Sequence, residues 1–268
     1  MSEIILNHLK QNKPIMIARL GATESKAILY PKLPLVLKKI FKKIIFKRMY
    51  EWSGFFPVNQ DSICKFSQLY YDDLKILDIL VSWRVEEKFI SAISSKIKKI
   101  KLFELEPYLS KNPWTRYLKN KKVLIIHPYE ETIRSQFDKR KKIFLDQNIL
   151  PDFELKTIKA VQSLSGENKD FKTWFDALSY MKSQIDKIDF DIALIGCGAY
   201  GLPLAAHVKR AGKIGVHMGG CLQILFGIMG KRWDEHPIIS KLYNDNWVRP
   251  SELEKPKSYL KVEDGCYW

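Results

Sequence analysis

The sequence DFDIALIGCGAYGLPLAAHVKRAGKIGVHMGG, residues 189–220, has the pattern of a buried strand, a glycine turn, a helix and a second strand. The apolar run 192–195 predicts the first strand, and residues 202–211 predict the helix. A second apolar run, 214–217, predicts the next strand. The turn contains three glycines in G-x-G-x-x-G spacing: Gly196, Gly198 and Gly201. Such a unit is typical of α/β proteins with a parallel sheet.

The glycine turn predicts a binding site for a phosphate group. A helix that starts directly after a strand has free backbone N–H groups, which attract phosphate oxygens together with the positive end of the helix dipole. NAD and FAD sites usually have an acidic residue after the second strand, but His217-Met218-Gly219-Gly220 stand there. The sequence therefore favours a nucleotide-sugar or another phosphate ligand. A second explanation stays open, in which the glycines only allow close packing of strand and helix.

The order of apolar segments along the chain predicts the fold class. Five short segments, near residues 15, 123, 155, 192 and 214, are each followed by a loop and a helix. This alternation predicts a Rossmann-like, doubly wound and mostly parallel sheet. Residues 1–30 and 121–268 would form this nucleotide-binding domain. Residues 31–120 show helical patterns rich in lysine and aromatic residues, and they would form a helical insertion.

Ligands of doubly wound sheets bind beyond the carboxyl ends of the strands, and polar residues follow the predicted strands at that edge. We expect a nucleotide-sugar to contact residues in these loops: Arg19, Gly21, His127, Gly196, Gly198, Tyr200, Gly201, Gly219, Gly220 and Gln223. The segment 230–235 adds Arg232, which could bind phosphate, and Trp233, which could stack on a base or sugar ring. A surface turn with an anchoring tryptophan is the alternative for that segment. The tail from about residue 244 is expected to wrap over the sheet domain as irregular structure.

Two side chains are candidates for catalysis. Glu24 begins a predicted helix beside the first strand, where a carboxylate could act as a base or as a metal ligand. His217, at a strand end, is the second candidate base. Simpler explanations remain open, because Arg19 and Glu24 could form a surface ion pair and His217 could be a hydrogen-bonded core residue.

Composition narrows the class of protein. The 268 residues are 46% hydrophobic and carry a formal net charge of +15, which predicts an anionic partner.

The four cysteines have no C-x-x-C spacing, and Cys197 and Cys221 lie in apolar segments, as expected for reduced core residues of a cytoplasmic protein. The amino terminus is too polar for a signal peptide, and the chain has no apolar run long enough to cross a bilayer. No nucleic-acid-binding motif is recognisable, so we expect no nucleic acid partner.

Residues 32–52, KLPLVLKKIFKKIIFKRMYEW, predict a basic amphipathic helix. Large apolar residues recur at helical spacing: Leu37, Ile40, Phe41, Ile44, Ile45, Met49 and Trp52. Six cations between Lys38 and Arg48 occupy other positions, and no acid occurs before Glu51. This pattern favours a helix that lies on an anionic membrane surface. The alternative is a domain helix with its apolar face on the core and its lysines in solvent.

Two stretches resemble a known family. Residues 17–24, IARLGATE, resemble the Arg-x-Gly-Asp-Gly-Glu segment near the amino terminus of GT-D type bacterial glycosyltransferases, and residues 191–220 resemble the closing strand, glycine turn, helix and Gly-His segment of that family. The resemblance implies a Rossmann-like enzyme of surface-glycan or glycoprotein glycosylation. Its donor would be a nucleotide-sugar, in the first place a UDP-sugar. Its acceptor would be a growing glycan on a lipid carrier at the inner face of the cytoplasmic membrane, as in capsule or lipopolysaccharide assembly.

The chain departs from the family pattern at one acid. The first acid of the family's Asp-x-Glu motif, associated with Mn²⁺ or Mg²⁺, is replaced by Ala22, and only Glu24 remains. One carboxylate is a poor divalent site unless other ligands join it, such as Glu167, Asp234 or the donor diphosphate. The sequence therefore predicts weak or absent metal dependence. Two alternatives stay open: another Rossmann enzyme, such as an oxidoreductase, and a non-catalytic membrane-associated scaffold of a glycan assembly complex.

Overall fold

The computed structural model describes residues 3–167 and 170–268. Its centre is one seven-stranded sheet in which every neighbouring pair of strands is parallel, with the order β3-β2-β1-β7-β6-β4-β5. The strands are β1 (Ile15–Arg19), β2 (Ile79–Ser82), β3 (Lys98–Lys101), β4 (Lys122–His127), β5 (Glu154–Lys159), β6 (Ile192–Ile195) and β7 (Ile214–His217).

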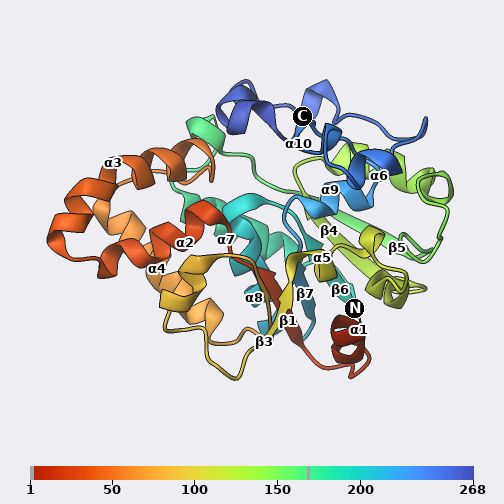
Figure 1. Ribbon diagram of the computed structural model, residues 1–268, viewed down its shortest axis with the longest axis horizontal. Helices are drawn as coiled ribbons and strands as arrows, with labels where there is room; N and C mark the ends of the chain where they lie inside the picture. Colours follow the sequence, from red (N-terminus) through yellow and green to blue (C-terminus); the bar gives the residue numbers. More distant parts are fainter. Residues whose placement is uncertain (1–2, 168–169) are drawn as a thin grey trace.

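Helices cover both faces of the sheet (Figure 1). They are α1 (Glu3–Leu9), α2 (Ala22–Leu29), α3 (Leu35–Glu51), α4 (Gln60–Leu74), α5 (Leu102–Leu105), α6 (Glu130–Asp138), α7 (Trp174–Ile185), α8 (Gly201–Arg210), α9 (Cys221–Leu225) and α10 (Lys231–Asp234). Short 3₁₀ turns join many of them. None of the helices within the described ranges combines the length and the apolar character that a bilayer-spanning helix needs.

The side chains of strands β1, β2 and β6 alternate between two cores, as expected for a sheet covered on both faces. In β1, Met16 and Ala18 belong to the core beneath α2, α4, α7 and α8. Ile15 and Ile17 point to the opposite core, which contains the apolar residues of α1, α6 and α9. The predicted doubly wound, Rossmann-like α/β fold is therefore confirmed.

The predicted helical insertion at residues 31–120 is wrong in its second half. Helices α3 and α4 form as expected, but the chain then returns to the sheet as β2 and β3, which extend it beyond β1. β2 has a buried apolar run, Ile79 to Val81, which the helical interpretation of this segment overlooks, and β3 has the sequence KKIK, in which Ile100 alone is buried. An edge strand with lysines on its exposed positions has no apolar run, so the pattern that reveals buried strands is missing.

Local geometry fixes the start of two helices near the strand ends. α2 begins at Ala22 with Gly21 as its N-cap. α7 begins at Trp174, because Thr173 and Asp176 form a reciprocal capping box there.

Candidate active site at the carboxyl edge of the sheet

A cavity of about 240 Å³ lies at the carboxyl ends of β1, β4, β6 and β7. Twelve of the predicted site residues line it: Arg19, Gly21, Glu24, His127, Gly196, Gly198, Tyr200, His217, Gly219, Gly220, Gln223 and Arg232. Gly201 and Trp233 are not part of its lining. The parallel sheet thus brings together loops that are far apart in the sequence, as the position of the strand ends predicted.

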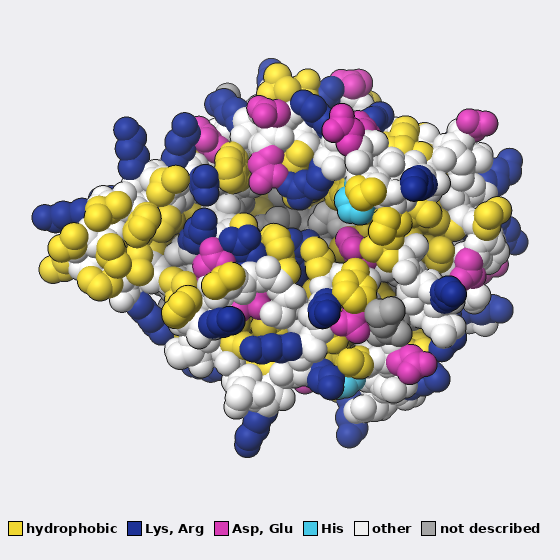
Figure 2. Space-filling view, viewed as in Figure 1, with side chains coloured by type: hydrophobic (Ala, Val, Ile, Leu, Met, Phe, Trp, Pro, Cys, Tyr) yellow, Lys and Arg dark blue, Asp and Glu magenta, His cyan; other side chains and the backbone are white. Residues whose placement is uncertain are grey.

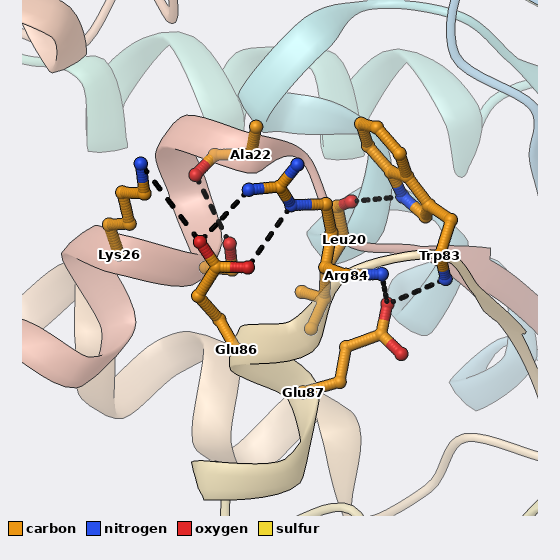
Figure 3. Close-up of polar contacts among 8 residues, drawn as sticks. Leu20, Ala22, Lys26, Trp83, Arg84, Glu86 and Glu87 are labelled. Carbon is orange, nitrogen blue, oxygen red and sulfur yellow. Dashed lines mark hydrogen bonds and ion pairs between the residues drawn. The ribbon is translucent and has the colours of Figure 1, made fainter.

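The first loop, between β1 and α2, is fixed from the side by residues after β2. The Trp83 indole N–H donates to the Leu20 carbonyl at 2.8 Å, and the Glu87 carboxylate accepts the backbone N–H groups of Trp83 and Arg84 at 3.1 and 3.0 Å. Figure 3 shows these residues beside the loop that carries Leu20 and Ala22. One hydrogen bond thus ties the loop at Leu20 to the segment after β2, whose own conformation Glu87 stabilises.

Arg19 brings a positive charge to the cavity. Its guanidinium lies 4.6 Å from the centre of the Trp83 ring, which favours a cation at that place. Within the described residues it forms no ion pair, so the surface pair of Arg19 with Glu24 is not present. The guanidinium is thus held in place without a carboxylate in ion-pair contact among the described residues, although its charge acts on the pKa of the Glu106 carboxyl.

Glu24 is buried at the start of α2. The Ser53 hydroxyl donates to Glu24 Oε1 at 2.7 Å. The second oxygen, Oε2, lies over Gly21, where an added Cβ would be only 1.8 Å away. Gly21 is therefore needed so that the carboxylate can fold back over the loop, and the two residues line the cavity together.

The three glycines of the turn have different surroundings. A Cβ on Gly196 would lie 2.8 Å from both the Gly219 carbonyl oxygen and His127 Cδ2, and one on Gly201 would lie 2.3 Å from the His217 ring. These two glycines allow close packing, which was the alternative explanation for the motif. Gly198 differs, because its φ is +56° and an added Cβ would meet open space.

The backbone N–H group of Gly198 offers a hydrogen-bond donor to the cavity. A 3₁₀ turn, Gly198–Tyr200, leads directly into α8. No acceptor for the N–H groups of Gly198 and Ala199 is found in the described part of the chain. Because the first donors of a helix have no partner inside it, they are free to bind an anion. The phosphate prediction therefore depends on Gly198, whereas Gly196 and Gly201 serve the packing.

Two buried histidines face the cavity with opposite hydrogen-bonding capacity. His127 Nδ1 accepts the Tyr129 N–H at 3.0 Å, so the proton of its neutral ring is on Nε2. His217 Nδ1 lies 3.1 Å from the Arg19 carbonyl oxygen, which can only accept, so that nitrogen carries the proton and Nε2 is an acceptor. Burial lowers the pKa of both imidazoles to about 3, and for His217 the Arg19 charge adds to this effect. Both rings are neutral near pH 7, and such a low pKa makes His217 a weak base.

Arg232 is already partnered. Its guanidinium forms an ion pair with Glu263, donates to the Tyr267 hydroxyl at 3.1 Å and lies over the Tyr267 ring. Trp233 is buried and packs against Tyr267 as well. The alternative of an anchoring tryptophan thus describes Trp233 better than the predicted stacking on a ligand.

Tyr200 and Gln223 line the cavity, but their polar groups hold the protein together. The Tyr200 hydroxyl pairs with the Ser163 hydroxyl at 2.9 Å, and its ring stacks on Trp174. The Gln223 amide donates to the Met229 and Tyr267 carbonyl oxygens, each at 2.9 Å. Gln223 therefore fastens the carboxyl-terminal tail, which wraps over the sheet edge as predicted.

Sequence reasoning missed a group of cavity-lining residues, most of them aromatic: Trp52, Ser53, Tyr70, Trp83, Tyr267 and Trp268. They come from the end of α3, from α4, from the segment after β2 and from the tail. None of them follows one of the five predicted strands closely, whereas Tyr129 and Ser163, which also line the cavity, lie in loops after predicted strands.

The residues of the cavity do not fit a divalent metal. Glu24 has Ala22 in place of a second carboxylate, and Glu263 is held by Arg232. Asp234, a candidate ligand from the sequence, pairs with Arg249, and Glu167 is not part of the lining. Among residues 3–167 and 170–268, no group of three or more histidine, cysteine or acidic side chains is placed to hold a metal ion.

Comparisons with known proteins gave no family, relative or solved structure against which the site could be checked. Comparison of the chain with models of known protein families gave no match, and neither curated proteins nor solved structures gave a significant one.

Proposed function

We propose that the protein is a glycosyltransferase that moves a sugar from a nucleotide-sugar donor to a glycan acceptor. One observation carries the proposal: the guanidinium of Arg19, which has no ion-pair partner among the described residues, the free N–H group of Gly198 and the buried carboxylate of Glu24 line the same cavity. The first two are groups that bind a diphosphate, and the third is a group that can accept a proton. Resemblance of residues 17–24 to GT-D type enzymes points in the same direction.

The donor diphosphate would lie between Arg19 and the start of α8. During transfer, the bond between the anomeric carbon and the diphosphate breaks, and negative charge grows on the leaving group. A fixed guanidinium and backbone N–H groups stabilise that charge without having to reorganise. Arg19 is held by the Trp83 ring for this role. Arg19 and the backbone N–H of Gly198 would thus do what a metal does in metal-dependent transferases.

Glu24 is the proposed base for the acceptor hydroxyl. Ser53 holds Oε1, which leaves Oε2 to accept the proton as the new glycosidic bond forms. His127, as a donor through Nε2, and His217, as an acceptor through Nε2, would position hydroxyl groups of the sugar. This assignment places the base on Glu24, because the low pKa of His217 makes it the poorer candidate.

As part of the same proposal, the acceptor is a growing glycan of surface-polysaccharide assembly, on a lipid carrier at the inner face of the cytoplasmic membrane. The net charge of +15 suits such an acceptor, because lipid-linked glycans carry phosphate.

A thermal-shift screen tests the donor class. The protein is heated with UDP-, GDP-, CMP- and dTDP-sugars, with NADH as the competing ligand class. We expect a UDP-sugar to raise the melting temperature, because a ligand that binds only the folded state stabilises it. Stabilisation by NADH without any effect of nucleotide-sugars would instead support an oxidoreductase.

A Glu24→Gln variant tests the catalytic role. We expect release of the nucleoside diphosphate from the donor found in the screen to fall by about 100-fold or more, the usual effect of removing a general base. Donor affinity should change little, because the amide keeps the size of the side chain. Glu167→Gln, outside the cavity lining, is the matched control and should retain full activity. If Glu24→Gln restores glycan assembly fully in a deletion strain, the protein is a scaffold rather than a transferase.

A further inference from the structure

Helix α3 presents large apolar side chains to solvent. Its amino-terminal half lies at one end of the molecule, where the space-filling view shows a cluster of hydrophobic side chains with lysines at its margin (Figures 1 and 2). The exposed side chains are Leu35, Val36, Leu37, Ile40, Phe41 and Ile44. Val36, Ile40 and Ile44 follow one another at four-residue spacing, and they are 68, 61 and 46% exposed. They form one continuous apolar ridge.

The core does not use this ridge. Of the apolar residues of α3, only Ile45 and Met49 are buried, and they lie on the side that packs against the body of the protein. The sequence predicted one apolar face that includes both sets of residues. The structure corrects this, because the helix has two apolar surfaces and one of them is left without a partner in the described chain.

Before its last residue, Glu51, helix α3 carries only positive charges. No acid occurs between Glu24 and Glu51. In the part of the chain that the structure describes, the ion pairs of α3 are limited to the Lys47 pair with Glu51, at 4.0 Å. Lys39, Lys42 and Lys43 are exposed beside the ridge. An apolar ridge flanked by unneutralised lysines is complementary to a surface with phosphates outside and acyl chains beneath.

We propose that α3 docks the protein on an anionic lipid bilayer, with Val36, Ile40, Phe41 and Ile44 inserted below the phosphates and the lysines bound to them. Insertion removes the ridge from water, and the lysines add electrostatic attraction that salt screens. A second copy of the chain suits this surface less well, because two α3 helices would bring their lysines together.

The position of α3 connects the lipid surface with the cavity. The helix ends at Glu51, and the next residues, Trp52, Ser53 and Gly54, line the cavity. Docking would therefore hold the cavity close to the bilayer, where a lipid-linked acceptor lies. This connection rests on the proposed function, whereas docking itself does not.

Co-sedimentation with vesicles tests the electrostatic part. We expect the protein to bind vesicles of phosphatidylcholine and phosphatidylglycerol at low salt and to bind pure phosphatidylcholine weakly. The triple variant Lys39→Gln, Lys42→Gln, Lys43→Gln should lower the partition coefficient by about tenfold or more. Lys96→Gln, Lys98→Gln, Lys99→Gln removes the same charge from exposed positions on and beside β3, and it should lower binding far less.

A second pair of variants tests insertion. Ile40→Gln with Ile44→Gln should abolish the part of the binding that remains at high salt, whereas Leu145→Gln with Leu253→Gln, at exposed sites elsewhere, should not. Donor affinity should stay unchanged in all four variants, so failure of docking and failure of the proposed function are distinguishable. Absence of binding to anionic vesicles at low salt overturns the proposal. So does a concentration-dependent dimer that Ile40→Gln dissociates, because it would identify a second copy as the occupant.

Discussion

At Gly198 the backbone has a φ of +56°, and an added Cβ would meet no protein atom within 4 Å. A side chain there is disfavoured by the backbone conformation and not by the packing of the protein. The space that it would fill belongs to the cavity. Gly212, at the other end of α8, has a φ of +80° and equally open surroundings, but it lies outside the cavity lining. The two glycines therefore have similar backbone conformations, but only Gly198 lies where a ligand in the cavity could contact it.

We expect Gly198→Val and Gly212→Val to lower the free energy of unfolding by similar amounts, about 1–3 kcal/mol, because both force a side chain into the left-handed region. Only Gly198→Val should weaken binding of the nucleotide-sugar, by about tenfold or more, which is roughly 1.4 kcal/mol. Urea unfolding and titration calorimetry measure the two effects separately. Unchanged affinity in folded Gly198→Val would mean that the turn only serves the packing of strand and helix.

Ala22 gives a second test at the scale of one residue. It lines the cavity with Glu24, at the place where the resemblance would put the first acid of a metal motif. We expect EDTA to leave donor affinity of the natural sequence unchanged. The variant Ala22→Asp should gain affinity when Mn²⁺ is added, because two carboxylates can then share the ion with the diphosphate. Loss of donor binding in EDTA by the natural sequence, with recovery in Mn²⁺, would contradict this prediction.

Among the elements, those with a strong local pattern could be predicted. The unit β6, glycine turn, α8 and β7 follows from an apolar run, the glycine spacing and a helix with one apolar side, and all of these lie within 30 neighbouring residues. β3 could not be predicted, because three of its four residues are lysines and its strand geometry comes from pairing with β2. Pairing between distant segments leaves no trace in a short window of sequence.

The residues of the candidate site could be predicted only where they follow a predicted strand. Arg19, Glu24 and His217 could be placed because each follows or ends a predicted strand. Trp83 could not be placed, because it follows β2, a strand that the sequence did not predict. It reaches Leu20 only because β2 pairs with β1. Tyr267 and Trp268 enter the cavity from the tail, whose path depends on long-range contacts such as the Gln223 amide with the Tyr267 carbonyl.

For the molecule as a whole, the cavity should make stability depend on pH. The pKa of an unfolded histidine is about 6.5, and burial lowers the pKa of His127 and of His217 to about 3. Above pH 6.5 both rings are neutral in the folded and the unfolded state, so the stability that depends on the neutral rings is fully present. As the pH falls towards 3, the unfolded chain takes up protons that the folded protein refuses, and stability is lost.

The carboxyl group of Asp73 has the opposite effect on the pH dependence of stability. Burial raises the pKa of its carboxyl to about 6, although Arg210 lies 2.7 Å away. The folded protein therefore takes up a proton at Asp73 before the unfolded chain does, and this contribution grows as the pH falls from about 7 to 4. The absolute pH curve is a sum of these opposing effects, so the histidines must be tested by comparison with a variant.

We expect the free energy of unfolding to fall between pH 7 and pH 5 by on the order of 2 kcal/mol for each of the two histidines, reduced by the gain at Asp73. The double variant His127→Asn, His217→Asn keeps a group at the place of each Nδ1, which can accept from Tyr129 or donate to Arg19, but it does not titrate. Its stability should fall less over the same range, or rise through Asp73. Urea unfolding at the two pH values measures the difference. Equal falls in the natural sequence and the variant would mean that the rings are charged in the folded protein, and the neutral donor and acceptor roles assigned to them would then be wrong.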